Sequence, residues 1–149
     1  MTDDLRILII EDDPDVALGC EQALQLEGFE CGCISSAELA LKHLSAEFAG
    51  VVISDIRLPR KSGLELLADI RVMDAELPVI LITGHGDISM AVQAMKDGAA
   101  DFLEKPFAPE RLIQAARRAL ERRRHVMEAR IREENRQTAA RSEEHTSEL

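Results

Sequence analysis

The sequence alternates five times between a short run of apolar residues and a longer segment with helical periodicity. The first run, residues 5–10, is almost entirely leucine and isoleucine, which is typical of a parallel strand buried on both faces. Five such units predict an α/β fold, a parallel sheet with helices on both faces, because right-handed crossovers connect successive parallel strands. The predicted strands span residues 5–10, 29–33, 51–54, 79–82 and 100–103.

Local signals mark where the intervening helices begin. Asp13 and Pro14 are typical of a helix N-cap and first turn, and Gly28 suits the end of that helix. Ser35 and Glu38 form a Ser-x-x-Glu pattern, which predicts a capping box for a helix that continues to about residue 47. The remaining helices are predicted over residues 64–73, over residues 87–96 with Asp87 as N-cap, and from residue 109 onwards.

The last predicted helix is longer than a compact α/β domain needs. From Pro109 the pattern continues without glycine or proline to about Asn135, roughly 40 Å at 1.5 Å per residue. Ile113, Leu120 and Met127 recur every seventh position, which predicts a short coiled coil, because a monomer would leave these side chains exposed. A solvated linker helix with Glu/Arg pairs is an equally suitable alternative.

We therefore predict a domain over residues 1–120, a linker helix over 121–140 and a non-native tail over 141–149. Arg123 and its basic neighbours lie close to Glu121 and lack aromatic residues, so we interpret them as a solvated helix face. The tail, RSEEHTSEL, matches one reading frame of a widely used sequencing adapter. This match indicates that the natural protein continues past about residue 140.

Composition excludes several classes of protein. The net charge is −10, and residues 1–108 hold 20 Asp and Glu against 8 Lys and Arg, whereas direct DNA binding needs clustered cations. No apolar run approaches the ~20 residues of a membrane-spanning helix, and the acidic residues 1–4 argue against a leader peptide. An odd number of cysteines, three in all, suggests no disulfide framework. These observations predict a cytoplasmic protein.

Reactive polar residues follow four of the five predicted strands. Glu11 and Asp12 follow the first strand and Asp55 the third, while Thr83 follows the fourth and Lys105 the fifth. In a doubly wound sheet, ligands bind at the carboxyl ends of the strands, where the strand order reverses. If the second strand lies outside the first, in the order 2-1-3-4-5, these four ends are neighbours and form one site.

The residue types at this site favour phosphoryl chemistry. Neighbouring carboxylates repel one another unless a cation lies among them, and oxygen ligands without His or Cys favour Mg²⁺. A metal ion, an ammonium group and a hydroxyl group around one carboxylate can bind the phosphoryl oxygens while that carboxylate acts as the nucleophile. Each acid alone could instead be a helix or turn cap, but that reading does not explain the whole group.

Four motifs in this order and spacing resemble those of two-component response-regulator receiver domains. The motifs are Glu11-Asp12-Asp13-Pro14, Ser54-Asp55-Ile56-Arg57-Leu58-Pro59, Ile82-Thr83-Gly84 and Glu104-Lys105-Pro106-Phe107. The resemblance covers about residues 4–120 and implies the flavodoxin-like receiver fold, a doubly wound five-stranded parallel sheet. Residues 83–88, 91–95 and 98–102 are further similar to sigma-54-dependent activators, in particular regulators of C4-dicarboxylate transport.

The resemblance implies a phosphoacceptor and a metal site. Asp55 would accept the phosphoryl group. Beside it, Mg²⁺ would be bound directly by Asp12, through water by Glu11, and by the backbone carbonyl of Arg57.

Three further residues acquire roles from the same resemblance. Thr83 and Lys105 would bind the phosphoryl group, and Phe102 stands where the family has a switch aromatic residue. The peptide bond between Lys105 and Pro106 would be cis, which an X-Pro bond adopts at low cost.

The implied function is a signalling switch and not an enzyme. A histidine kinase would phosphorylate the domain, and an ATPase domain and a DNA-binding domain beyond this chain would give the output. We expect a homodimer that pairs through the C-terminal helix and the side of the sheet with the fourth and fifth strands.

Two alternatives fit less well. A haloacid-dehalogenase-like phosphatase would have an acid in place of Arg57, and a flavin-binding module would have a Ser/Thr-rich loop in place of Glu11-Asp12-Asp13-Pro14.

Overall fold

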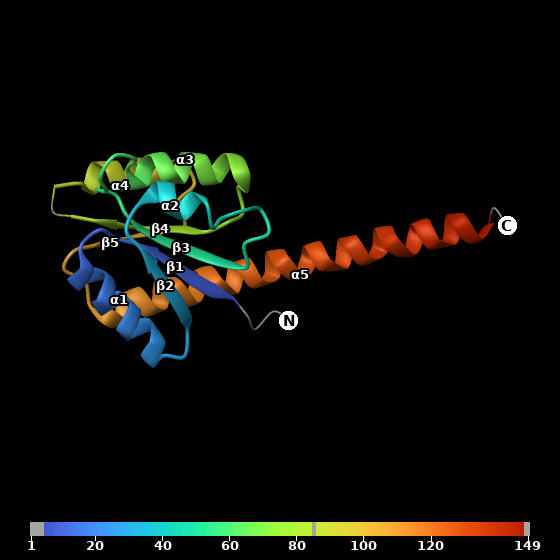
Figure 1. Cartoon of the computed structure of the whole chain (residues 1–149), viewed down its shortest axis with the longest axis horizontal. Helices are drawn as coiled ribbons and strands as arrows, with labels where there is room; N and C mark the ends of the chain where they lie inside the picture. The colour runs from blue at the N-terminus through green and yellow to red at the C-terminus, as the bar shows by residue number, and fades with distance from the viewer. Residues whose placement is uncertain (1–4, 85, 148–149) are drawn as a thin grey trace.

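Five parallel strands form one sheet in the order β2-β1-β3-β4-β5 in the computed structural model of the chain (Figure 1). The predicted strand order is thereby confirmed, and the order reverses between β1 and β3. The strands are β1 (Arg6–Ile10), β2 (Glu30–Ile34), β3 (Gly50–Asp55), β4 (Val79–Thr83) and β5 (Asp101–Glu104). The helices are α1 (Pro14–Leu26), α2 (Ala37–Leu41), α3 (Gly63–Met73), α4 (Ile88–Lys96) and α5 (Pro109–Ser147).

The structure describes residues 5–84 and 86–147, and side chains as far as residue 141. The acidic residues 1–4, on which the prediction of no leader peptide rests, lie outside this part of the chain. Most side chains of the tail, residues 141–149, also lie outside it, so its non-native origin stays a prediction. Within the described residues, none of the helices combines the length and the hydropathy needed to cross a membrane.

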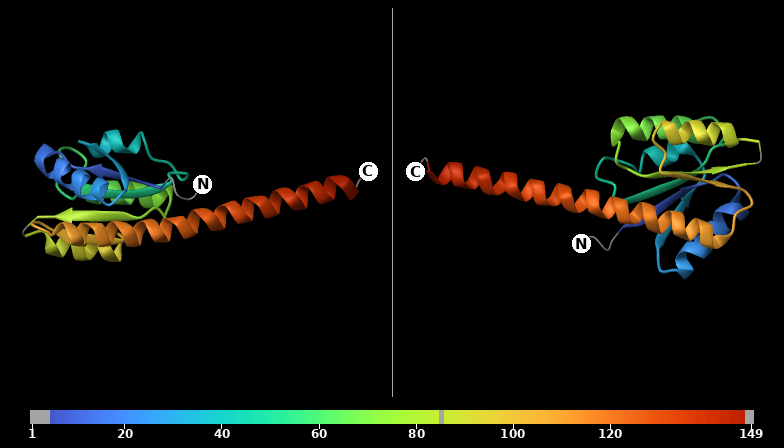
Figure 2. Two further views of the ribbon diagram at one scale, coloured as in Figure 1. Left: turned by 90° about the horizontal axis from the view of Figure 1, so that it is seen from below. Right: turned by 180° about the vertical axis from the view of Figure 1, so that it is seen from behind.

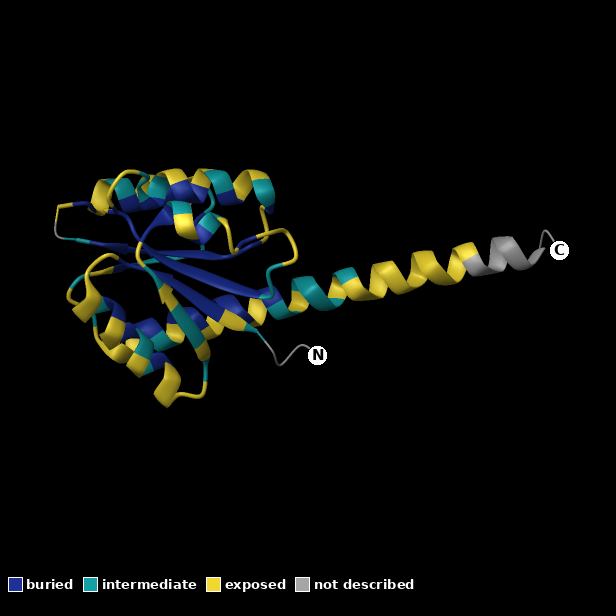
Figure 3. Ribbon diagram, in the orientation of Figure 1, coloured by how far each residue is buried: buried dark blue, intermediate teal, exposed yellow. Residues whose placement is uncertain are grey.

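The sheet separates two apolar clusters. Helices α2, α3 and α4 cover one face, and α1 and the first part of α5 cover the other (Figures 1 and 2). Neighbouring residues of a strand alternate between the faces, so Ile7 and Ile9 pack towards α1 and α5 while Leu8 and Ile10 pack towards the other layer. Burial on both sides explains why β1, β3 and β4 read as continuous apolar runs (Figure 3).

Helix α3 starts in direct contact with the backbone of Asp55. Its N-cap is Ser62, which forms a capping box with Glu65. Gly63 donates its N–H to Ile56 O at 2.8 Å, and a Cβ atom on Gly63 would lie 2.2 Å from Asp55 O. Only glycine therefore fits where the helix approaches the end of β3.

Two helix starts differ from the sequence prediction. The cap of α2 is Ser36 and not Ser35, since Ser36 Oγ accepts the Leu39 N–H at 3.2 Å. Helix α2 has only 5 residues and ends well before residue 47. After Leu41 the backbone bonds are of the i to i−3 turn type, His43 N–H donating to Ala40 O and Leu44 N–H to Leu41 O. Asp87 precedes α4 but makes no capping hydrogen bond, because its carboxylate binds an arginine instead.

The C-terminal helix corrects two further expectations. Leu120 is 5% exposed and packs against the sheet, and Ile113 is partly buried there, so these side chains are not a free coiled-coil face. Arg123 is 0% exposed, so it does not belong to a solvated face. Beyond residue 130, α5 extends away from the domain and its described residues are exposed (Figure 3).

Candidate functional site

Three carboxylates meet at the carboxyl ends of β1 and β3. Glu11 and Asp12 follow β1 and Asp55 ends β3, and one oxygen of each lies within 4.8 Å of the others. Glu11 and Asp55 are buried, whereas Asp12 is exposed. Adjacent parallel strands that end at the same level thus bring together the acids that the sequence suggested.

Lys105 supplies a positive charge to this group. Its Nζ lies 2.9 Å from Asp55 Oδ2 and 3.1 Å from Glu11 Oε1. The Lys105 N–H donates to Thr83 O at 2.8 Å, and the Lys105–Pro106 bond is cis, as expected. Burial alone would lower the pKa of Lys105, but the hydrogen bonds and charges of Asp55 and Glu11 outweigh it and raise that pKa.

One lysine does not balance the three acids. Burial, together with the hydrogen bond and charge of Asp55, raises the pKa of Glu11 to about 7 although Lys105 opposes this shift. Glu11 Oε1 is buried, and among the described residues its nearest cation is Lys105 Nζ at 3.1 Å, which forms an ion pair with it but lacks the angles of a full hydrogen bond. A hard divalent cation bound by oxygen atoms suits this group, because it would neutralise the carboxylates without His or Cys ligands.

The loop after β3 folds back over the phosphoacceptor candidate. The Arg57 N–H donates to Asp55 Oδ1 at 3.2 Å, so both oxygens of Asp55 have partners from different segments. This bond places the backbone N–H of Arg57 beside the Asp55 carboxylate, and the metal-binding role of the Arg57 carbonyl stays a prediction.

Thr83 and Phe102 lie on β4 and β5, on the side of the acids away from β1. The Thr83 side chain is buried and its hydroxyl donates to Gly84 O at 3.2 Å, not to Asp55. Phe102 pairs in register with Leu81 and packs, partly buried, against the cluster that includes α4. The strands therefore bring Thr83 to the edge of the site, whereas Phe102 faces the α4 layer.

Sequence reasoning missed an ion pair that joins two loops of the site. Arg57 Nε donates to Asp87 Oδ2 at 2.8 Å, and Arg57 Nη2 donates to Asp87 Oδ1 at 2.6 Å. The bidentate pair connects the β3–α3 loop to the start of α4. The position of Asp87 before a helix gave only a capping signal, and nothing in the spacing indicated Arg57 as its partner.

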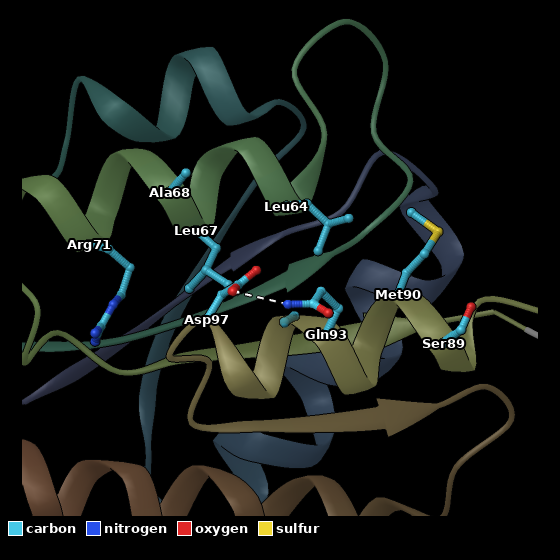
Figure 4. Close-up of a pocket in the computed structure, with 9 residues that line it drawn as sticks. Leu64, Leu67, Ala68, Arg71, Ser89, Met90, Gln93 and Asp97 are labelled. Atoms are coloured by element: carbon cyan, nitrogen blue, oxygen red, sulfur yellow. Dashed lines mark hydrogen bonds between the residues drawn. The ribbon is translucent and has the colours of Figure 1, made fainter.

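A cavity of about 530 Å³ lies elsewhere, between α3 and α4. Leu64 and Leu67 from α3 and Met90 and Gln93 from α4 line it, and Gln93 donates to Asp97 at 3.2 Å (Figure 4). It contains neither the acids nor Lys105. We therefore place the chemistry at the carboxyl ends of the strands and not in this cavity.

Known proteins share both the sequence pattern and the fold. The model of the response regulator receiver domain matches residues 7–117. The C4-dicarboxylate transport transcriptional regulatory protein DctD of Rhizobium meliloti is 56% identical over 124 residues, which are 83% of this chain and 27% of that protein. Its namesake in Pseudomonas aeruginosa is 48% identical over 84% of this chain and 27% of that protein. The chain thus spans about a quarter of the length of these relatives.

Solved structures give the same result. The receiver domain of NtrX from Brucella abortus has 42% sequence identity and a TM-score of 0.73, covering 77% of this chain and 98% of that chain. The structure of FixJ-N has 40% identity and a TM-score of 0.70, covering 78% and 94%. These proteins are similar over the sheet and its helices, and not merely in isolated motifs.

Proposed function

This chain belongs to the response regulator receiver family, and on that premise we propose that Asp55 is its phosphoacceptor. Domains of this family are phosphorylated by histidine kinases and regulate transcription through attached output domains, so their role is regulatory and not catalytic. The observation that supports Asp55 is its place between Lys105 and the two acids that follow β1. One carboxylate there has both a cationic neighbour and a candidate metal site.

The proposed metal site uses four groups of this chain. Asp12 would bind Mg²⁺ directly and Glu11 through water, with Asp55 and the carbonyl of Arg57 as the remaining ligands. When bound, Mg²⁺ would neutralise the carboxylates and the incoming phosphoryl oxygens.

The remaining site residues would couple the new phosphoryl group to the fold. As a bond forms between Asp55 and phosphorus, the bond from phosphorus to the donor breaks and the donor leaves. Lys105 is already 2.9 Å from Asp55 and would pair with a phosphoryl oxygen. The Thr83 hydroxyl would give up its hydrogen bond to Gly84 O and donate to another phosphoryl oxygen instead. We propose that Phe102 then changes its packing against the α4 layer.

The phosphatase alternative receives no support. A phosphatase of that type needs a second acid, two residues after the nucleophile, as its general acid. Here Arg57 occupies that position, and its side chain is bound to Asp87. The matches to receiver domains cover most of the chain, and this coverage favours the receiver family over the phosphatase.

Metal dependence tests the proposed function directly. Incubation of the chain with acetyl phosphate and Mg²⁺ should add one phosphoryl group, measured by intact-mass spectrometry. Chelation of the metal, or loss of the proposed metal ligand in Asp12→Asn, should lower this yield at least about tenfold, because without a bound cation the incoming phosphoryl oxygens are not neutralised. The exposed Asp15 offers a matched control, and Asp15→Asn should be labelled like wild type. Full labelling without a divalent metal would contradict the site.

The activity of the whole protein is a proposal that rests on its relatives. We propose that a sensor histidine kinase is the phosphodonor and that output is transcriptional control of the sigma-54 type, as the similarity to the two C4-dicarboxylate transport regulators suggests. DNA contact would then belong to the output domains, and a cytoplasmic location follows from that role.

We also propose a homodimer formed by α4, β5 and the free part of α5. Ile88, Val92 and Met95 lie on one face of α4 and are 37–44% exposed, and Ile131 on α5 is 48% exposed. Leu120 is no suitable test site, because its removal would damage the domain core.

Sedimentation tests this dimer. We expect wild type to sediment as a dimer and Val92→Glu with Ile131→Glu to sediment as a monomer, since each charge would enter an apolar interface. Val72→Glu is the control, because Val72 is 90% exposed on α3, outside the proposed interface. A wild-type chain that is monomeric in both phosphorylation states would disprove the proposal.

A further inference from the structure

The part of α5 beyond Leu120 is attached to the domain by Asp74, Arg123 and Arg130, which we name the Asp74 cluster. Arg123 Nη1 donates to Asp74 Oδ2 at 3.0 Å, and Arg123 is fully buried. Arg130, about two turns further along α5, donates to both oxygens of Asp74 at 2.9 Å. One carboxylate thus binds two guanidinium groups of the same helix.

The two arginines also bind the loop that precedes β3. Arg123 donates to Phe48 O from Nε at 3.1 Å and from Nη2 at 2.8 Å, and to Ala46 O at 3.2 Å. Arg130 Nη1 donates to Ala46 O at 2.9 Å. The helix is therefore linked to two separate segments, and loss of Asp74 would leave the buried Arg123 without a countercharge.

Asp74 is itself held firmly at the end of α3. Its N–H donates to Ile70 O at 2.7 Å, and Oδ1 accepts the N–H of Glu76 at 3.0 Å. Burial alone would raise the pKa of Asp74, but hydrogen bonds from Arg130, Glu76 and Arg123 outweigh it and lower the pKa to about 2. The carboxylate therefore stays charged at neutral pH.

We propose that the Asp74 cluster makes residues 121–130 part of the receiver body and sets the direction in which α5 leaves it. The segment that is free to rearrange then begins after Arg130, not after Leu120. Residues 131–141 are all exposed, so no described side chain continues the attachment. A change in the body would therefore move residues 121–130 together with it. This inference goes beyond the proposed phosphorylation and does not depend on it.

Amide hydrogen exchange tests the proposal on the whole chain. Exchange at residues 121–130 should rise at least about tenfold in Asp74→Ala, and by less in Arg130→Ala, while residues 109–119 keep their wild-type rates. The control is Glu133→Gln, which affects only the exposed contacts of Glu133 with Arg136 and Gln137 and should change nothing at residues 121–130. Residual dipolar couplings should report one common alignment for the body and residues 121–130 in wild type, and separate alignments in both cluster variants.

Two results would overturn the proposal. One is wild-type exchange at residues 121–130 in both cluster variants, and the other is a wild-type helix that reorients independently from residue 121. If Asp74→Ala does not fold, the result for Arg130→Ala tests the proposal by itself. This variant should fold, because Arg130 is partly exposed and its removal leaves the ion pair of Arg123 with Asp74 in place. No step requires phosphoryl transfer, so failure here leaves the assignment of Asp55 intact.

Discussion

Asp55→Asn should abolish phosphorylation of the chain by acetyl phosphate in the presence of Mg²⁺, with a fall in yield of at least about 100-fold. The carboxamide keeps the size of the side chain but replaces the nucleophilic oxygen pair with a poor nucleophile. In wild type, one product labile to base and hydroxylamine should form, as expected of an acyl phosphate. Intact-mass spectrometry of both proteins measures the difference.

The matched control is Asp97→Asn, since Asp97 is an exposed acid at the end of α4, away from the carboxylate site. It should be labelled like wild type. A modified Asp55→Asn protein, with the group on Glu11, Asp12 or a histidine, would contradict the assignment of a single phosphoacceptor.

Removal of Lys105 should separate two roles of its ammonium group. Without a metal, Lys105→Ala leaves Glu11 and Asp55 without their cationic partner, so we expect the free energy of unfolding to fall by about 1–3 kcal/mol. Added Mg²⁺ should stabilise this variant and reduce the difference in free energy of unfolding between it and wild type. An ion that binds only the folded state shifts the unfolding equilibrium towards that state. Urea unfolding with and without Mg²⁺ measures both effects.

The same variant tests how the phosphoryl group acts on the fold. Lys105→Ala should still be labelled in part, but the amide chemical shifts of Thr83 and Phe102 should no longer change on phosphorylation. Lys42→Ala is the control, because Lys42 is an exposed lysine at the end of α2. Wild-type stability and wild-type shift changes in Lys105→Ala would show that the ion pair has neither role.

The sheet and most of the site were predictable because both depend on local patterns. The apolar runs identify strands that are buried on both faces, and polar residues stand where each run ends. Parallel topology then forces those ends together, so Glu11, Asp12, Asp55 and Lys105 could be grouped without coordinates. No long-range information beyond the strand order was needed.

Contacts between distant segments could not be predicted in this way. Arg123 lies among other arginines, and only its contacts with Asp74 and with the carbonyls of Ala46 and Phe48, all distant in the sequence, distinguish it as a buried residue. The same holds for Arg57 and Asp87, which are 30 positions apart. The seven-residue spacing of Ile113, Leu120 and Met127 also could not distinguish packing on the sheet from packing on a second helix, because both offer an apolar surface. In the structure Leu120 packs on the sheet.

Helix α5 is continuous from the sheet to Ser147, and this has a consequence for the construction of chimeric regulators. Each residue inserted into such a helix turns everything downstream by about 100° and moves it about 1.5 Å along the axis. An insertion of seven residues after Arg130 restores the original angular phase to within roughly 20°, whereas an insertion of two nearly reverses it. A foreign output module joined beyond Arg130 would therefore inherit its orientation from the number of residues in the junction, provided that those residues continue the helix.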